Sequence, residues 1–254
     1  WIHHPVDELL RKERGAKLRS IPVRVLFDDP ELSLRANYTM FDRESGRPVC
    51  VGNGETCKRA TESGMQSLVC PSPAACPLAL GGQCKPYGRL HVRIDCEGCT
   101  DELGSFVLRT TGFNSIRTLS ARLRYLHALS GGVLSTLPLE LRVRGKSTTL
   151  SRRTPIYYVD LTLRSDCTLE QAVADARIAW DARKAAGVNQ AALDEAARMG
   201  FALGEFEECE EDGAAVVEEF YPQEDVQGAA PELAPGMGLE LADKIRSKAR
   251  RLEA

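Results

Sequence analysis

The sequence predicts an α+β protein with a mainly antiparallel sheet, a few helices and a zinc-stabilised, cysteine-rich insertion. Three observations lead to this class. Short segments in which apolar and polar residues alternate recur through the first two thirds of the chain, and turn residues separate them. Seven of the nine cysteines fall between Cys50 and Cys99. The hydrophobic fraction of 43% and the charged fraction of 27% are close to those of globular domains, so a buried core can form.

The predicted strands have apolar residues at every second position, which is the pattern of a half-buried strand. Leu90, Val92 and Ile94, for example, alternate with polar residues. The strand that follows, after a short connection, can pair with this one. The strands are expected at 21–27, 38–41, 90–94, 104–111, 137–144 and 155–163.

The predicted helices are identified by their apolar faces and by their end signals. One of them begins at Asn114 or Ser115 as the N-cap and ends at Gly131–Gly132. Its apolar face is formed by Ile116, Leu119, Leu123 and Leu126. Thr168 and Gln171 form a capping box for another helix. The remaining helices are expected at 6–14, 169–185, 189–201 and 239–252.

The chain divides into three predicted parts with different charge. Residues 1–165 form the α+β core with the zinc module at about 50–99, residues 166–203 a helical hairpin, and residues 204–254 an acidic flexible linker with a short C-terminal helix. Residues through Ser165 carry 24 Lys and Arg against 16 Asp and Glu, and the remainder carries 9 against 20. A basic surface attracts phosphate backbones, and an acidic segment can compete for it. The alternative is a solvated surface with a solubilising tail.

The cysteine-rich segment is expected to contain little regular structure, because it is rich in Gly, Pro and Ser and lacks periodicity. An odd number of cysteines, their clustering and the lack of a secretory signal favour metal over disulfides. Structural zinc takes four thiolates, and its binding folds the segment that supplies them. The predicted zinc ligands are Cys57, Cys70, Cys76 and Cys84. Cys50 can replace Cys57, and the Cys96–Cys99 pair can join the site or form a second, partial one. Inert buried thiols and an iron–sulfur cluster are the alternatives.

No motif in the sequence predicts catalysis. The H-E-x-x-H, G-x-S-x-G, Walker A and Rossmann patterns are absent. A catalytic zinc needs an open position beside a general base. The four histidines occupy positions typical of surface or core residues: His3, His4, His91 and His127. We therefore expect a protein that is not an enzyme.

A basic segment follows the cysteines. Nine Lys and Arg but one acid, Glu140, occur between Arg109 and Arg153. Such side chains contact phosphate oxygens or an acidic protein partner, or form a solvated sheet face. The candidate residues for binding nucleic acid or a partner are Arg117, Arg122, Arg124, Arg142, Arg144, Lys146, Arg152 and Arg153.

The order of motifs after Cys84 resembles a known family. C-K-P at 84–86 precedes Y-G-R-L at 87–90, a G-x-F strand begins at Gly104, and a T-T-G-F-N turn spans 110–114. This order resembles the phage recombination directionality factors that work with large serine integrases. It is also similar to related proteins of mobile elements that carry hydrolase or metal-binding labels.

The resemblance covers roughly residues 19–165. It implies an accessory protein without its own chemistry, which binds an integrase–DNA complex and directs recombination towards excision. The implied partner surface is the zinc-containing and coiled-coil region of the integrase, with DNA contacted directly or only through the integrase. The implied Zn²⁺ ligands are Cys57, Cys70, Cys76 and Cys84, although the spacing around Cys57 departs from the pattern and leaves the fourth ligand open.

The expected location is the cytoplasm of a bacterial host that carries a phage or mobile element. No stretch approaches the ~20 consecutive apolar residues that span a bilayer, so no membrane partner is expected. Two other functions remain open: a general nucleic-acid-binding replication or repair accessory protein, and a zinc hydrolase.

Overall fold

The computed structural model describes residues 4–11, 16–98, 105–147, 149, 153–203 and 213–221. The chain divides into two units, Trp1–Phe220 and Tyr221–Ala254. The first unit contains every helix and strand described below. Two predicted segments, the acidic run at 205–212 and the helix at 239–252, lie outside the described residues.

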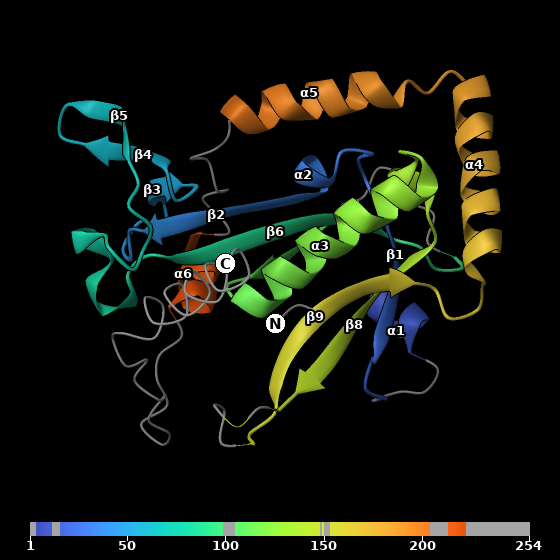
Figure 1. The fold of residues 1–254 in the computed structure, drawn as a ribbon, viewed down its shortest axis with the longest axis horizontal. Helices are drawn as coiled ribbons and strands as arrows, with labels where there is room; N and C mark the ends of the chain where they lie inside the picture. Colours follow the sequence, from blue (N-terminus) through green and yellow to red (C-terminus); the bar gives the residue numbers. More distant parts are fainter. Residues whose placement is uncertain are drawn as a thin grey trace, which may run out of the picture. The chain divides into compact units, whose positions relative to one another are not determined.

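The first unit is built on a nine-stranded sheet (Figure 1). Its order is β5-β4-β3-β2-β6-β1-β8-β9, with β7 also paired to β6. Every strand pairing among the described residues is antiparallel, so the predicted α+β class with a mainly antiparallel sheet is confirmed. The strands are β1 (Ser20–Val25), β2 (Leu34–Phe41), β3 (Pro48–Gly52), β4 (Thr56–Thr61), β5 (Gly64–Val69), β6 (Lys85–Ile94), β7 (Phe106–Thr110), β8 (Leu139–Lys146) and β9 (Ile156–Leu163).

The sheet forks at strand β6. Val92 pairs with Val25 of β1 and also with β7, while Leu90 pairs with Leu34 of β2 and also with β7. Strands β1 and β2 therefore lie one after the other along the same edge of β6, opposite β7. The short helix α2 (Pro30–Ser33) connects them. Beyond β2, the sheet extends through β3, β4 and β5, and we call these three strands the cysteine wing. Beyond β1, it extends through β8 and β9, and we call these two strands the ribbon.

Helix α3 (Phe113–Ser130) covers the main core, as its predicted apolar face requires. Gly88 allows the helix to approach β6, because a Cβ atom there would lie 2.8 Å from Ile116 Cγ1. Gly131 ends the helix in the left-handed conformation, with φ of 70°. Each fully buried leucine stabilises such a core by about 1.5–3 kcal/mol. The buried core residues of α3 are Leu119, Leu123 and Leu126, and they pack with Leu90, Val92, Leu139 and Leu161.

The predicted N-cap of this helix is wrong. Gly112 occupies the N-cap position and makes no side-chain cap. The Asn114 side chain instead accepts a hydrogen bond from Lys146 Nζ at 2.8 Å, and Ser115 Oγ accepts one from the Val159 amide at 3.1 Å. Both polar side chains attach α3 to the ribbon, and this tertiary use replaces the local one.

The described residues of this unit form four further α-helices: α1 (Val6–Leu10), α4 (Leu169–Ala185), α5 (Gln190–Leu203) and α6 (Gly213–Phe220). The capping box of α4 is confirmed, because Thr168 Oγ1 accepts from the Gln171 amide at 3.3 Å. Helices α4 and α5 occupy the predicted helical pair. Helix α6 was not expected. No helix among the described residues is long and apolar enough to cross a membrane.

The cysteine-rich segment contains more regular structure than its composition predicts. Three strands and the 3-10 helix η1 (Pro77–Gly82) fall within it. Periodicity did not reveal the strands because β5 is exposed along its whole length and β4 buries only Cys57 fully. The expectation of little regular structure is therefore wrong. Backbone pairing, rather than an apolar face, defines these strands.

Candidate metal centre and basic surface

Five cysteines gather at the base of the cysteine wing. Cys50, Cys57 and Cys70 are buried and pack with Met40 in a small cluster of their own, separate from the main core. Electrostatic interactions connect Cys84 with all three and with Cys76. The four predicted ligands are thus brought into one neighbourhood, together with the predicted substitute Cys50. Their positions are Cys50 in β3, Cys57 in β4, Cys70 after β5, Cys76 before η1 and Cys84 before β6.

Gly52 makes this close approach possible. It pairs with Cys57 across β3 and β4. A Cβ atom at Gly52 would lie 2.7 Å from Cys57 Cβ and 3.0 Å from Cys70 Sγ. Any larger residue at this position would push two of the candidate ligands apart.

The electrostatics do not favour Cys57 or Cys84 as a nucleophile. Burial raises the pKa of Cys84 to about 12, with smaller contributions from the neighbouring cysteines. Burial also raises the pKa of Cys57. Reactive cysteines have lowered pKa values. Arg59 is a cation that contacts a sulfur of the cluster, since its Nη2 lies 4.0 Å from Cys57 Sγ.

The donor chemistry of the cluster fits structural zinc, which prefers thiolates and displaces their protons. The positions of the atoms do not form a finished site. No group of three or more His, Cys, Asp or Glu side chains within the described ranges is arranged to hold a metal ion. Zinc therefore stays a prediction.

The remaining cysteines lie apart from this cluster or outside the described residues. Cys96 is disulfide-bonded, so its sulfur is not a thiolate ligand. The Cys167 thiol donates to the Arg164 carbonyl at 3.3 Å. Cys99 and Cys209 lie outside the described residues.

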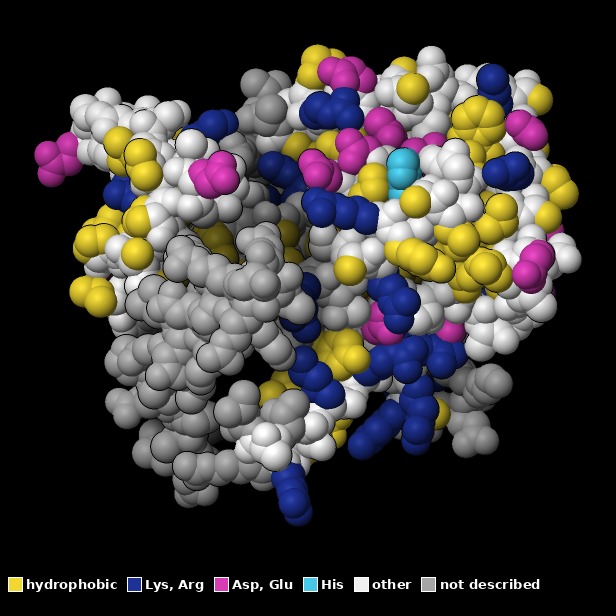
Figure 2. Space-filling model, in the orientation of Figure 1, with side chains coloured by type: hydrophobic (Ala, Val, Ile, Leu, Met, Phe, Trp, Pro, Cys, Tyr) yellow, Lys and Arg dark blue, Asp and Glu magenta, His cyan; other side chains and the backbone are white. Residues whose placement is uncertain are grey.

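The ribbon carries the basic surface. Arg142, Arg144 and Lys146 lie on one face of β8, where they pair with Asp160, Tyr158 and Ile156 of β9. Figure 2 shows Lys and Arg side chains gathered over this part of the molecule.

Asp160 organises the basic surface. Its side chain is 3% exposed, and its two carboxylate oxygens accept from Arg144 Nε at 2.7 Å and from Arg122 Nε at 3.1 Å. Both contacts are made by Nε rather than by the terminal nitrogens, and both arginine side chains are nearly half exposed. The geometry can therefore present two fixed guanidinium groups to an anion. The sequence analysis did not single out Asp160, although an acidic residue within an alternating strand is a signal that could have identified it.

The other predicted basic residues are less organised. Arg142 pairs with the buried Glu140 at 2.6 Å. Lys146 Nζ lies 5.7 Å from the centre of the Tyr158 ring. Arg124 forms an exposed ion pair with Glu31, which contributes little. Arg117 and Arg153 are exposed, and Arg152 lies outside the described residues.

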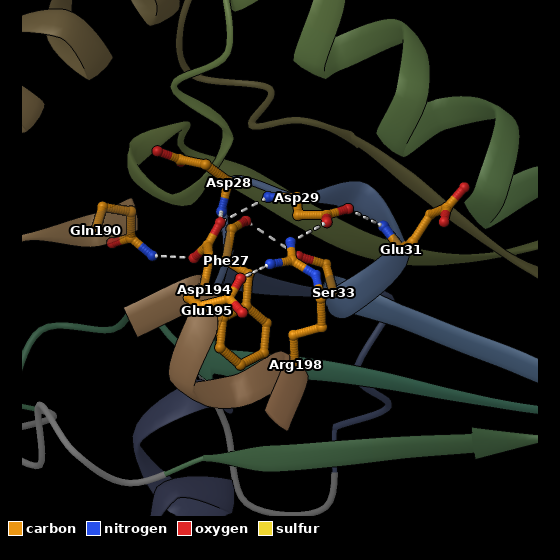
Figure 3. Close-up of polar contacts among 9 residues, drawn as sticks. All are labelled: Phe27, Asp28, Asp29, Glu31, Ser33, Gln190, Asp194, Glu195 and Arg198. Carbon is orange, nitrogen blue, oxygen red and sulfur yellow. Dashed lines mark hydrogen bonds and ion pairs between the residues drawn. The ribbon is translucent and has the colours of Figure 1, made fainter. Parts of the chain in front are cut away.

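A third polar cluster fixes α5 to the loop between β1 and α2 (Figure 3). Asp194 accepts hydrogen bonds from the backbone amides of Asp28 and Asp29, both at 3.1 Å. Gln190 donates to Asp194 at 2.8 Å, and Arg198 pairs with Asp29 at 3.0 Å. The sequence analysis singled out none of these residues.

The same contact places α5 against a histidine of β6. The Phe201 ring centre lies 5.0 Å from that of His91, and Phe27 contacts both rings. Burial, with Arg89 and Arg35 nearby, lowers the pKa of His91 to about 4. His91 is therefore neutral at physiological pH and packs against Phe27 and Phe201.

Comparison with known proteins gives one match. The family model Gp3-like, described as recombination directionality factor-like, matches residues 3–164. The matched range contains all nine strands and α3, and it ends before α4. No curated protein and no solved structure matches the chain. Because the matched range is more than half of the sequence, the chain belongs to the Gp3-like family of recombination directionality factor-like proteins.

Proposed function

We propose that the protein is a non-enzymatic, zinc-containing accessory factor that binds a large serine integrase–DNA complex and directs recombination towards excision. The observation that carries this proposal is the family match over the whole sheet, from β1 to β9. Membership of the family points to an accessory role in DNA recombination. The integrase, the direction and the zinc are the finer parts of the proposal.

The zinc would have a structural role. Cys57, Cys70, Cys76 and Cys84 would hold it, with Cys50 as the alternative to Cys57. When bound, zinc would supply a cross-link between segments that are distant along the sequence. The support is the convergence of five thiols from both the wing and the start of β6. The high pKa of Cys84 and Cys57 favours an inert, closed role over catalysis.

The partner contact would use the ribbon and α3. The residues that support it are Arg122 and Arg144, which Asp160 holds, together with Lys146. We propose the coiled-coil and zinc-containing region of the integrase as the partner surface. The protein would act in the cytoplasm of a bacterial host that carries the phage or mobile element.

The test is recombination with a cognate serine integrase. The intact protein should co-elute with the integrase and change the choice of attachment sites from integration to excision. The variant Arg122→Glu/Arg144→Glu should lose this effect, while Arg177→Glu, at an exposed position on α4 and outside the proposed contact, should keep most of it. Absence of co-elution together with unchanged site choice would contradict the proposal.

A general nucleic-acid-binding function is the second candidate, and the Asp160 cluster is the observation that favours it. Two oriented guanidinium groups, with Tyr158 opposite Arg144 across the strand pair, are suited to phosphate contact. This function requires DNA binding without any integrase, with an affinity that falls steeply as salt rises. Neutralising Arg122 and Arg144 should then reduce the salt slope by about 2.

The zinc hydrolase alternative needs an open metal position. A spectrum of the cobalt-substituted protein distinguishes the two arrangements, because four sulfur ligands leave no place for water. A mixed ligand set with an open position would favour the hydrolase.

A further inference from the structure

Helix α6 packs against the sheet through one aromatic residue. Phe220 is completely buried, and its ring centre lies 4.8 Å from that of Phe41 and 5.8 Å from that of Tyr87, in edge-on geometry. Lys85 Nζ donates to the Phe220 carbonyl at 2.9 Å and also lies over the Phe220 ring. Val216, one turn earlier, is buried as well. We call Phe41, Tyr87 and Lys85 the anchor site.

The anchor site and its occupant belong to different parts of the chain. Phe41 ends β2, and Lys85 and Tyr87 begin β6, so the anchor site lies within the family-matched range. Helix α6 lies beyond that range. The sheet therefore supplies the complete site, and α6 is a ligand that reaches it from the C-terminal extension.

The attachment of α6 is of a kind that can be reversed. The helix has eight residues, too few to be stable by itself in water, so it depends on its contact with the sheet. Among the described residues, the helix is held by two buried side chains, Val216 and Phe220, and by the hydrogen bond from Lys85. Elements with few buried contacts open locally well before the whole protein unfolds.

The sheet face around the anchor site has a basic character. Arg35, Arg89 and Arg109 are directly opposite one another on β2, β6 and β7. They lie on the face that carries Tyr87, because Tyr87 and Arg89 are two residues apart on one strand. Three guanidinium groups side by side give this face a positive character, which is complementary to an acidic ligand. Helix α6 contributes Glu218, which is exposed, and the sequence that precedes it is acidic at Glu205, Glu207, Glu208, Glu210, Glu211 and Asp212.

We propose that the anchor site is a docking site for an acidic amphipathic helix of a partner protein, and that α6 occupies this site in cis until the partner displaces it. The ligand is defined by an aromatic residue for the space between Phe41 and Tyr87, an apolar residue one turn earlier, and acidic residues for the arginine-rich face. The proposed role in recombination uses the ribbon and α3, whereas the anchor site lies on the sheet face opposite α3. The two proposals are therefore independent.

The experiment uses the full chain with a specific protease site placed within 204–212, cut after folding. The probe is a labelled peptide of residues 204–221, and a matched peptide carries Phe220→Ala. The cut chain should bind the probe about tenfold or more tightly than the uncut chain, because a tethered ligand competes at high effective concentration. The Phe220→Ala peptide should bind at least about tenfold more weakly than the probe.

Two substitutions in the cut chain locate the binding. Lys85→Met should weaken binding of the probe, because it removes the donor to the Phe220 carbonyl. Ile178→Ala, at an exposed position on α4, should leave it unchanged. Far-UV circular dichroism before and after cutting shows that each chain is folded.

Three results would overturn the proposal. The first is a folded, cut chain that does not exchange its own helix for the probe, and the second is equal binding of the two peptides. A concentration-dependent dimer that the probe disperses would make a second copy of the chain the occupant instead of a partner protein.

Discussion

Asp160 shows how a single buried acid can shape a basic surface. Its two oxygens bind one Nε each from Arg122 and Arg144, which come from different elements. The carboxylate thus fixes the directions of two guanidinium groups that would otherwise sample many rotamers. A buried charge is tolerated only when it is paired in this way.

Replacement of Asp160 by Ala should lower the free energy of unfolding by about 1–2 kcal/mol, because two charge-assisted hydrogen bonds are lost while both arginines can still reach water. Urea denaturation measures the change. Asp166→Ala is the matched control, since its carboxylate pairs with Arg164 at an exposed position. Equal effects of the two substitutions would show that burial of Asp160 does not matter.

His91 should make the protein sensitive to mild acid. Its pKa is lowered from 6.5 to about 4 in the folded state, so the unfolded chain binds the proton more tightly. The stability that neutral His91 contributes is present above pH 6.5 and is lost as the pH falls towards 4. The loss should be about 1–2 kcal/mol once screening by solvent is included.

The variant His91→Phe removes the titrating group and keeps an aromatic ring beside Phe27 and Phe201. Its stability should therefore fall less between pH 7 and pH 4 than that of the wild type, as measured by urea denaturation at each pH. A parallel decline of both proteins would assign the acid sensitivity to other groups.

At the scale of elements, α5 is attached by polar contacts rather than by a broad apolar face. Asp194 caps two backbone amides of the loop after β1, and Gln190 extends the contact to the Leu26 carbonyl at 3.0 Å. The helix can therefore be placed accurately while much of its surface stays exposed. Its position in turn determines where Phe201 meets the sheet.

Substitution of Asp194 by Ala should destabilise the docking of α5 by about 2–3 kcal/mol, because two backbone amides lose their acceptor. Burial raises the pKa of Asp194 above 3.8, so the folded state holds the proton more tightly than the unfolded state. The stabilisation from Asp194 therefore declines as the pH rises through the interval just above 3.8.

Hydrogen exchange in α5 at pH 4 and pH 7 measures this effect. The difference in α5 protection between the wild type and Asp194→Ala should be smaller at pH 7 than at the lower pH. Glu195→Ala is a suitable control, because Glu195 pairs only with Arg198 at an exposed position among its described contacts. A larger difference at pH 7 would contradict the sign of the pKa shift.

The elements also show what a single sequence can predict. Helices α3 and α4 were found because their signals are local: apolar residues at helical spacing and a capping box. Helix α6 was not found, because its partners Phe41 and Tyr87 are more than a hundred residues away. The contacts between α5 and the loop after β1 were not predicted for the same reason. The sequence predicted four metal ligands, with Cys50 as the substitute for Cys57, but the arrangement of the cysteines depends on strand register, which composition does not encode.

At the scale of the whole molecule, the two apolar clusters are separate. The main core lies between α3 and the sheet, and the small cluster of Cys50, Cys57 and Cys70 lies in the wing. A structural metal would therefore stabilise one part of the protein without being needed by the other.

Removal of zinc by a chelator should increase hydrogen exchange in β3, β4 and β5 while the strands of the main core stay protected. Cys57→Ser should have the same effect, and Cys167→Ser, whose thiol lies outside the cluster, should have none. Metal analysis gives the stoichiometry, with one zinc per chain expected. Unchanged exchange in the wing after complete chelation would show that thiol packing alone holds it.

The fork at β6 also affects how the chain folds while it is being synthesised. The wing is assembled from consecutive hairpins, so its strands can pair as soon as they leave the ribosome. Strand β1 waits much longer, because its outer neighbour β8 lies over a hundred residues further along. During that interval the edge of β1 is an unpaired template that can join another chain. Newly made protein can therefore aggregate through β1 before the ribbon closes over it.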